Sequence, residues 1–168
     1  DPYARTTGVN GERGMVIDLN STNPESGWNE IEDQPESYTD ATIYELHVRD
    51  FSIDDSSGVK DEWQGKFMAL TEEGTTVNGV KGNPSTGLDY MKEMGFTHLH
   101  LLPIYDYGSV DETKCDTFNW GYDPVNYNTP EGSYSTYPYN GEVRVKEMKE
   151  MVDTLHKNNI GVIMDVVY

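Results

Sequence analysis

The chain has 168 residues, the size of one ordinary domain, and a formal net charge of −18. Such an acidic balance argues against nucleic acid and anionic membranes as partners, because both attract Lys and Arg, and no apolar run is long enough to span a membrane. The charge suits a neutral substrate or simply high solubility.

Residues 1–40 are polar and rich in Asn, Gly, Pro and Glu, which is typical of a connector that follows an upstream module. One short apolar stretch, residues 15–19 (MVIDL), predicts a strand within it. Asn10 and Gly11 precede this stretch and predict a turn, because both residue types tolerate positive φ.

The pattern changes at residue 41, where residues 41–48 (ATIYELHV) are β-branched and aromatic and predict a strand. Residues 52–83 show no sustained periodicity and are interpreted as a long loop. Residues 98–102 (HLHLL) predict a second strand, which ends at Pro103.

A helix is predicted between these two strands. Leu88, Met91 and Met94 lie on one helical face, which we expect to be buried. Ser85 is the expected N-cap, and Gly95 is expected to end the helix.

The last third of the chain repeats this order. A long aromatic loop occupies residues 104–140, and a second helix follows with apolar residues at three- and four-residue spacing up to Asn158 and Asn159. Residues 160–167 (IGVIMDVV) then form a continuous apolar run, typical of a strand in a parallel sheet with both faces buried.

The strand-to-helix loops are about 35 residues long, whereas the helix-to-strand loops have two or three residues. This asymmetry favours a (β/α)8 barrel, in which function is built on the loops after the strands. A doubly wound nucleotide-binding sheet is the main alternative, but residues 79–82 (GVKG) do not provide its glycine-rich turn. The predicted fold is therefore α/β, a partial TIM barrel of three strands and two helices over residues 41–168.

Three strands cannot close an eight-stranded barrel. The third is the most apolar, and as an edge it would expose unpaired backbone groups. We therefore expect that this polypeptide does not fold alone and that the remainder of the barrel is its partner.

The loop after the second strand is unusually aromatic, with seven of the twelve tyrosines between Tyr105 and Tyr139. Flat rings beside short acids and amides suit sugar binding, since rings stack on the apolar faces of sugars and polar groups bind hydroxyls. A loop packed by its own side chains is an equal alternative on composition alone.

Residues 118–124 (FNWGYDP) decide between them, because they closely resemble the seven-residue signature of type I pullulanases, starch-debranching enzymes of the α-amylase superfamily. The family usually has Tyr where this chain has Phe118.

Further segments agree with this resemblance. Residues 44–51 and 95–103 resemble the family's first and second barrel strands, and residues 165–168 resemble the start of its first conserved region on the third strand. Residues 1–4 and 9–14 resemble the join from the family's β-sandwich modules.

The resemblance implies that Tyr122 stacks on the glucose next to the cleaved bond. Asp123 would hold sugar hydroxyls or fix the loop, whereas Asn119 and Trp120 would mainly shape it.

Asp165 ends an apolar strand, where an unpartnered acid would be costly, so it should accept hydrogen bonds from neighbouring site residues and have a supporting role. Asp50 is given the same supporting role, and Arg49 is expected to pair with a nearby acid. His98 and His100 alternate with Leu and are interpreted as core histidines with satisfied hydrogen bonds.

The resembled family carries its catalytic carboxyl groups on later strands, and none of those motifs occurs here, so we name no catalytic residue. The loop also contains clustered acids, which we do not interpret as a catalytic pair: Asp106, Asp111, Glu112, Asp116 and Asp123. No metal site is assigned, although the clustered acids leave calcium binding open. The single cysteine, Cys115, excludes an internal disulfide and is interpreted as a chance surface thiol.

The expected function is hydrolysis of α-1,6 linkages in pullulan, starch or glycogen, with retention and without an organic cofactor, by a parent enzyme to which this chain contributes binding loops. An isoamylase-type or branching enzyme is a neighbouring alternative. A non-catalytic α-glucan-binding or scaffold protein is an alternative of a different class. Localisation stays open.

Overall fold

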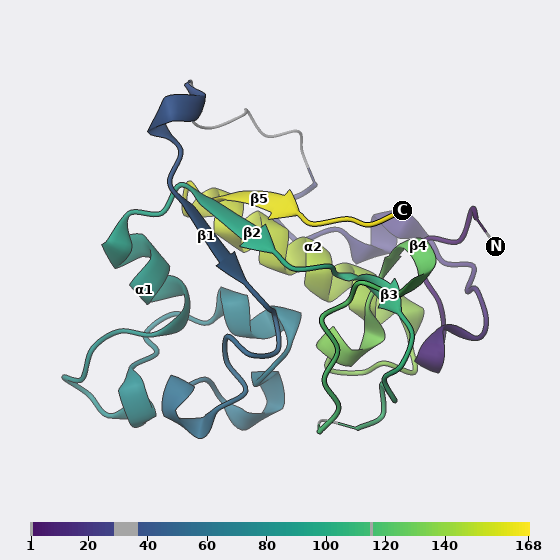
Figure 1. Cartoon of the computed structure of the whole chain (residues 1–168), viewed down its shortest axis with the longest axis horizontal. Helices are drawn as coiled ribbons and strands as arrows, with labels where there is room; N and C mark the ends of the chain where they lie inside the picture. Colours follow the sequence, from purple (N-terminus) through teal and green to yellow (C-terminus); the bar gives the residue numbers. More distant parts are fainter. Residues whose placement is uncertain (1, 29–36, 115) are drawn as a thin grey trace.

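The computed structural model describes residues 2–28, 37–114 and 116–168, so the interpretation of Cys115 lies outside the described residues. Its main sheet is parallel, in the order β1-β2-β5 (Figure 1). The strands and the helices that connect them are β1 (Ile43–Leu46), α1 (Gly87–Met94), β2 (His98–Leu101), α2 (Gly141–Lys157) and β5 (Gly161–Met164). The predicted order of strands and helices is confirmed.

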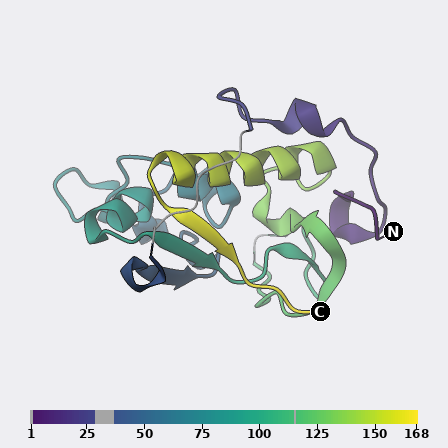
Figure 2. The same ribbon diagram turned by 90° about the horizontal axis from the view of Figure 1, so that it is seen from above.

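Helix α2 lies along one face of this sheet (Figure 2). The core between them contains Leu99 and Leu101 of β2, which alternate with histidines, together with Met151 and Leu155 of α2; all four are fully buried. Strand β5 is an edge strand of this sheet, as the sequence analysis considers for the third strand, and its residues are only partly buried, with Met164 38% exposed. Neither described helix is long and apolar enough to cross a membrane.

Helix α1 corrects two predictions at its ends. Thr86, not Ser85, occupies the N-cap position, and the Ser85 hydroxyl instead hydrogen-bonds Glu93 at 2.6 Å. Leu88 and Met91 are fully buried as predicted, whereas Met94 is 56% exposed. Met94 is the last helical residue, and the left-handed Gly95 at φ 72° turns the chain away directly after it.

The long loops contain structure that the sequence analysis did not predict. Residues 52–83 form a series of short 3₁₀ turns, one of which, Phe67–Thr71, packs against α2. Within residues 104–140, β3 (Tyr105–Tyr107) and β4 (Pro124–Pro130) pair antiparallel with irregular register. Because β4 begins and ends with Pro, its composition does not indicate a strand.

The described part of residues 1–40 also differs from the prediction. The turn at Asn10 and Gly11 is confirmed by φ angles of 57° and 67°. The predicted strand over residues 15–19 is wrong: Leu19–Thr22 is a 3₁₀ turn, and the β-pairing of this region is a single bridge between Thr7 and Gly14. The segment crosses the outer side of α2 (Figure 2), where Lys149 donates to the Leu19 carbonyl at 3.0 Å.

Arg144 of α2 is completely buried and joins the N-terminal segment to the aromatic loop. Its guanidinium donates to both carboxylate oxygens of Glu112, at 3.2 and 2.9 Å. It also donates to the carbonyls of Gly8, Pro130 and Pro138, at 3.3, 3.2 and 2.9 Å. One side chain thus fixes the positions of three chain segments.

Two more buried acids lie beside this pair. Burial raises the pKa of Asp106 to about 6 and that of Glu131 to about 8. Asp106 accepts from Asn126 at 2.6 Å, and Glu131 accepts the backbone N–H groups of Tyr107 and Ser133. The structure therefore gives Asp106, Glu112 and Glu131 hydrogen-bonding roles in the support of the loop.

We expect Arg144→Met to destabilise the protein by about 3–5 kcal/mol, because it leaves Glu112 buried without its counter-charge. The melting temperature by calorimetry, in the complete protein that carries this chain, checks this. Lys146→Met is the control on the same helix: Lys146 has an exposed pair with Glu150 at 3.8 Å, so its loss should cost under about 0.5 kcal/mol. Equal melting temperatures for the two variants would contradict the role of Arg144.

Candidate functional site

The segment 118–124 lies at the carboxyl ends of the parallel strands. The Tyr122 hydroxyl donates to Asp165 Oδ2 at 2.5 Å, and Asp165 directly follows β5. The Asn119 carbonyl accepts from Nε2 of His47, which directly follows β1, at 2.8 Å. The segment is therefore attached to the ends of the two outer strands.

Asn119 holds the segment in shape. Its side-chain amide donates to the Gly108 carbonyl at 2.9 Å and to Asp123 Oδ1 at 2.8 Å, and its Oδ1 accepts the backbone N–H of Gly121 at 2.9 Å. Because one amide satisfies three partners, the turn has a single preferred geometry. Asp123 takes part in this turn, since its backbone carbonyl also accepts from the Gly108 N–H.

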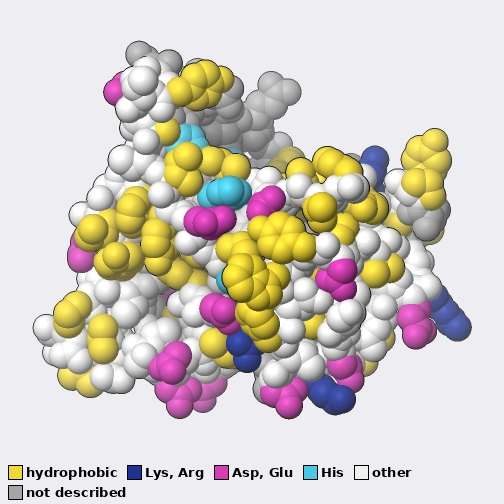
Figure 3. Space-filling view, viewed as in Figure 1, with side chains coloured by type: hydrophobic (Ala, Val, Ile, Leu, Met, Phe, Trp, Pro, Cys, Tyr) yellow, Lys and Arg dark blue, Asp and Glu magenta, His cyan; other side chains and the backbone are white. Residues whose placement is uncertain are grey.

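Tyr122 and Trp120 present their rings to solvent. Tyr122 is 45% exposed and Trp120 is 62% exposed, with Phe118 packed edge-on against the indole ring at 6.4 Å. The hydrogen bond to Asp165, assisted by burial, raises the pKa of Tyr122 to about 12. Figure 3 shows hydrophobic side chains gathered on this face beside acidic and histidine side chains.

His47 is a site residue that the sequence analysis did not single out. It is 9% exposed, and its ring packs against Phe118 with centroids 5.0 Å apart. Since a carbonyl only accepts, Nε2 carries the proton donated to Asn119, and Nδ1 accepts the Asp50 backbone N–H at 3.4 Å. In the sequence, the only indication of this role is the position of His47 at the end of a predicted strand.

Asp50 lies in the turn after β1, outside the Tyr122–Asp165 contact. Its carboxylate pairs with Arg49 at 3.1 Å, so the expected pairing of Arg49 with a nearby acid is confirmed. Asp50 reaches the motif through the backbone hydrogen bond to His47.

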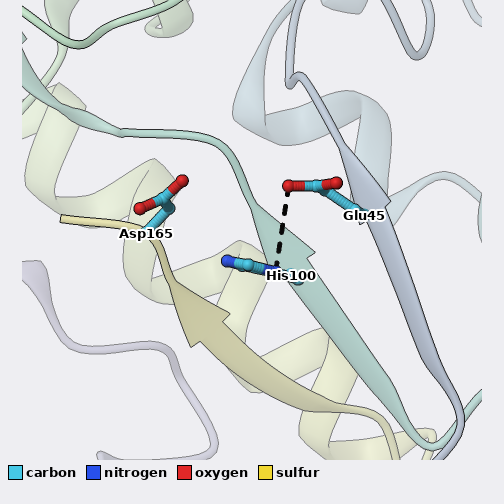
Figure 4. A group of neighbouring side chains, drawn as sticks. All are labelled: Glu45, His100 and Asp165. Carbon is cyan, nitrogen blue, oxygen red and sulfur yellow. Dashed lines mark ion pairs between the residues drawn. The ribbon is translucent and has the colours of Figure 1, made fainter.

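Glu45 and His100 extend the site along the sheet. They are directly paired in the β1–β2 register, and both lie with Asp165 on the face away from α2, where the three side chains converge (Figure 4). Their ligand atoms all lie within 4.8 Å of one another. The interpretation of His100 as a satisfied core histidine is wrong within the described residues, because its side chain is 31% exposed and makes no hydrogen bond to them.

A parallel sheet whose carboxyl-edge loops carry exposed aromatic rings and acids is the arrangement of a (β/α)-type catalytic domain. The model of the alpha amylase catalytic domain family matches residues 47–168. The chain belongs to this family, whose members include glycoside hydrolases of the pullulanase type.

Several relatives within the family are pullulanases. The chain is 44% identical to the pullulanase of Bacillus subtilis over 171 aligned residues, covering all of this chain and 22% of that protein. Two solved structures also match all of it. The pullulanase from Paenibacillus barengoltzii, in complex with maltohexaose and alpha-cyclodextrin, matches with a TM-score of 0.91, 53% identity and 26% of that chain covered. The pullulanase from Bacillus acidopullulyticus matches with a TM-score of 0.90, 49% identity and 20% of that chain covered.

The chain thus spans about a fifth to a quarter of the length of the relatives it matches. The family resemblance based on the segment 118–124 is confirmed.

We expect Gly121→Ala to distort the motif. Gly121 has a φ of +92°, and an added Cβ would lie 2.7 Å from the Pro103 carbonyl oxygen. Gly82→Ala is the matched control, with φ +95° and no atom within 4 Å of the added Cβ. Both variants carry backbone strain, so the clash should make Gly121→Ala less stable than Gly82→Ala by about 1–3 kcal/mol. Equal melting temperatures would contradict this packing.

Proposed function

We propose that this chain is part of a debranching enzyme that hydrolyses α-1,6-glucosidic linkages in pullulan, starch or glycogen. The single observation that carries the proposal is the position of the segment 118–124 over the carboxyl ends of the parallel strands, with Tyr122 bonded to Asp165. In (β/α) barrels this edge holds the active site. The pullulanase relatives support the choice of reaction.

In this proposal the three parallel strands are the first three of an eight-stranded barrel, which begins near residue 41. Residues 1–40 connect that barrel to an upstream β-sandwich module. The remaining strands complete the sheet beside β5, and they are the partner that the exposed Met164 would contact.

Tyr122 is the proposed stacking surface for glucose next to the cleaved bond. Its ring is half-exposed, and its hydroxyl is fixed by Asp165, so the ring is held in one orientation before the sugar arrives. Asn119 and Asp123 hold the turn, and Trp120 extends the apolar surface beside it. Asp165 and Asp50 support these groups.

We assign no catalytic carboxylate to this chain. Retention requires two carboxyl groups about 5–5.5 Å apart across the scissile bond, one as nucleophile and one as acid/base. Asp106, Glu112 and Glu131 are buried and hydrogen-bonded within the fold, and Asp165 is engaged by Tyr122. The catalytic pair would therefore come from later strands of the parent enzyme, and no organic cofactor is required.

A non-catalytic α-glucan-binding protein is the alternative, since the exposed rings suit sugar binding without chemistry. Release of reducing ends from pullulan by the complete protein separates the two functions. Binding of pullulan without any cleavage would favour the alternative. A preference for amylopectin over pullulan would favour an isoamylase-type enzyme.

We expect Tyr122→Ala to lower kcat/KM on pullulan by about 5- to 150-fold, equivalent to about 1–3 kcal/mol of lost stacking and packing in the transition state. Tyr122→Phe keeps the ring and loses only the bond to Asp165, so it should lose less activity than Tyr122→Ala. Steady-state kinetics on pullulan, in the complete protein, checks both.

Tyr137→Ala is the control. Tyr137 is 54% exposed, similar to Tyr122, but it lies in the turn before α2, outside the motif. Its kcat/KM should stay within about twofold of the parent protein. A Tyr122→Ala variant with unchanged kinetics would remove Tyr122 from the site.

A further inference from the structure

Three potential metal ligands come from three adjacent parallel strands. Glu45 of β1 pairs in register with His100 of β2, which pairs with Ile163 of β5; Asp165, two residues further, is on the same face. The strand register therefore sets the spacing of the three side chains, and their ligand atoms lie within 4.8 Å of one another (Figure 4).

Within the described residues, the side chains of Glu45 and His100 make no hydrogen bond. Nδ1 of His100 lies 4.0 Å from Glu45 Oε1, which is too long for a direct hydrogen bond. Neither side chain hydrogen-bonds another group in the described part of the chain. Asp165 makes its side-chain bond to Tyr122 through Oδ2, which leaves Oδ1 as a second acceptor.

The charges distinguish this group from the other cluster of acids. Asp106, Glu112 and Glu131 also lie close together, but there the buried Arg144 supplies the positive charge. Among the described residues, neither Glu45 nor Asp165 forms an ion pair with Lys or Arg, and the only basic partner of Glu45 there is His100. Two carboxylates and one imidazole suit an ion of charge +2.

We propose that Glu45, His100 and Asp165 form a binding site for a divalent transition-metal ion of the Zn²⁺ type. One imidazole nitrogen with two carboxylate oxygens is a ligand set that Zn²⁺ accepts, with water in the fourth position. Ca²⁺ fits less well, because it prefers six to eight oxygen ligands. With bonds of about 2.1 Å, tetrahedral geometry places ligand atoms about 3.4 Å apart. Because the ligand atoms here lie within 4.8 Å of one another, the side chains must close by up to about 1.4 Å.

The ion would lie next to Tyr122. Binding at Asp165 places a positive charge beside the acceptor of the Tyr122 hydroxyl and fills space at the edge where the sugar is proposed to bind. This consequence rests on the proposed function: a bound ion and an α-glucan should compete. The metal site itself does not depend on it.

Isothermal titration of the complete, metal-stripped protein with Zn²⁺ tests the site. The variant His100→Gln removes the nitrogen ligand from a partly exposed position, and Glu45→Gln replaces a charged carboxylate ligand, 59% exposed, with a neutral and much weaker amide, so both should fold. The parent protein should bind one Zn²⁺ ion. In each variant the affinity for Zn²⁺ should fall about 100-fold or be lost, because loss even of a residue that only hydrogen-bonds a metal ligand lowers metal affinity by about 10- to 100-fold.

His98→Gln is the matched control, because His98 is on the same strand, two residues earlier, and bonds Thr97 at 2.9 Å. It should keep the parent stoichiometry and affinity. Unchanged Zn²⁺ binding in His100→Gln and Glu45→Gln, with melting temperatures equal to that of the parent, would overturn the site. Absence of Zn²⁺ binding to the parent protein would also overturn it.

A second titration separates this proposal from the proposed function. Saturating maltotriose should weaken Zn²⁺ binding in the parent protein. If Zn²⁺ binding depends on His100 but its affinity does not change with maltotriose, the metal site is supported and the proposed position of the sugar next to Tyr122 is contradicted.

Discussion

The structure depends on one buried ion pair, Arg144 with Glu112. Burial of two charges is costly unless geometry and additional hydrogen bonds compensate, and here the guanidinium reaches both carboxylate oxygens and several carbonyls. Glu112, Pro130 and Pro138 all belong to the loop between β2 and α2, so the pair ties that loop to the helix at both ends. The segment 118–124 lies between those tethered points. The segment therefore keeps its position at the carboxyl edge of the sheet because Arg144 holds the loop that carries it.

The regular part of the fold was predictable, because strands and helices differ in hydrophobic period. Residues 41–48, 98–102 and 160–167 are dense in β-branched and apolar residues, and all three become parallel strands with helices between them. The loops were not predictable in the same way. Strand β4 contains prolines and asparagines, and its pairing with β3 depends on contacts far along the chain, such as Asn126 with Asp106. Hydrophobic periodicity indicates the local geometry of a segment, but it contains no information about contacts between residues that are distant in the sequence.

The same distinction applies to the site. The segment 118–124 was recognisable as a motif, and Asp165 as an acid at a strand end, but the bond between Tyr122 and Asp165 spans 43 residues and required the structure. His47 and Glu112 were missed as supports because a single His or Glu carries no spacing signal. His100 was misread because alternation with Leu predicts which residues share a face, but not whether that face is covered.

The contacts of Arg144 have a consequence for variation among homologous sequences and in directed evolution. Arg144 binds the backbone carbonyls of Gly8, Pro130 and Pro138. Because every amino acid has a backbone carbonyl, these contacts do not restrict which side chain stands at the three positions. Position 144 has no such latitude: a lysine ammonium has three donors on one nitrogen and lacks the planar fork that spans the Glu112 carboxylate. A library randomised across this region should therefore retain arginine at that one place while its surroundings diversify.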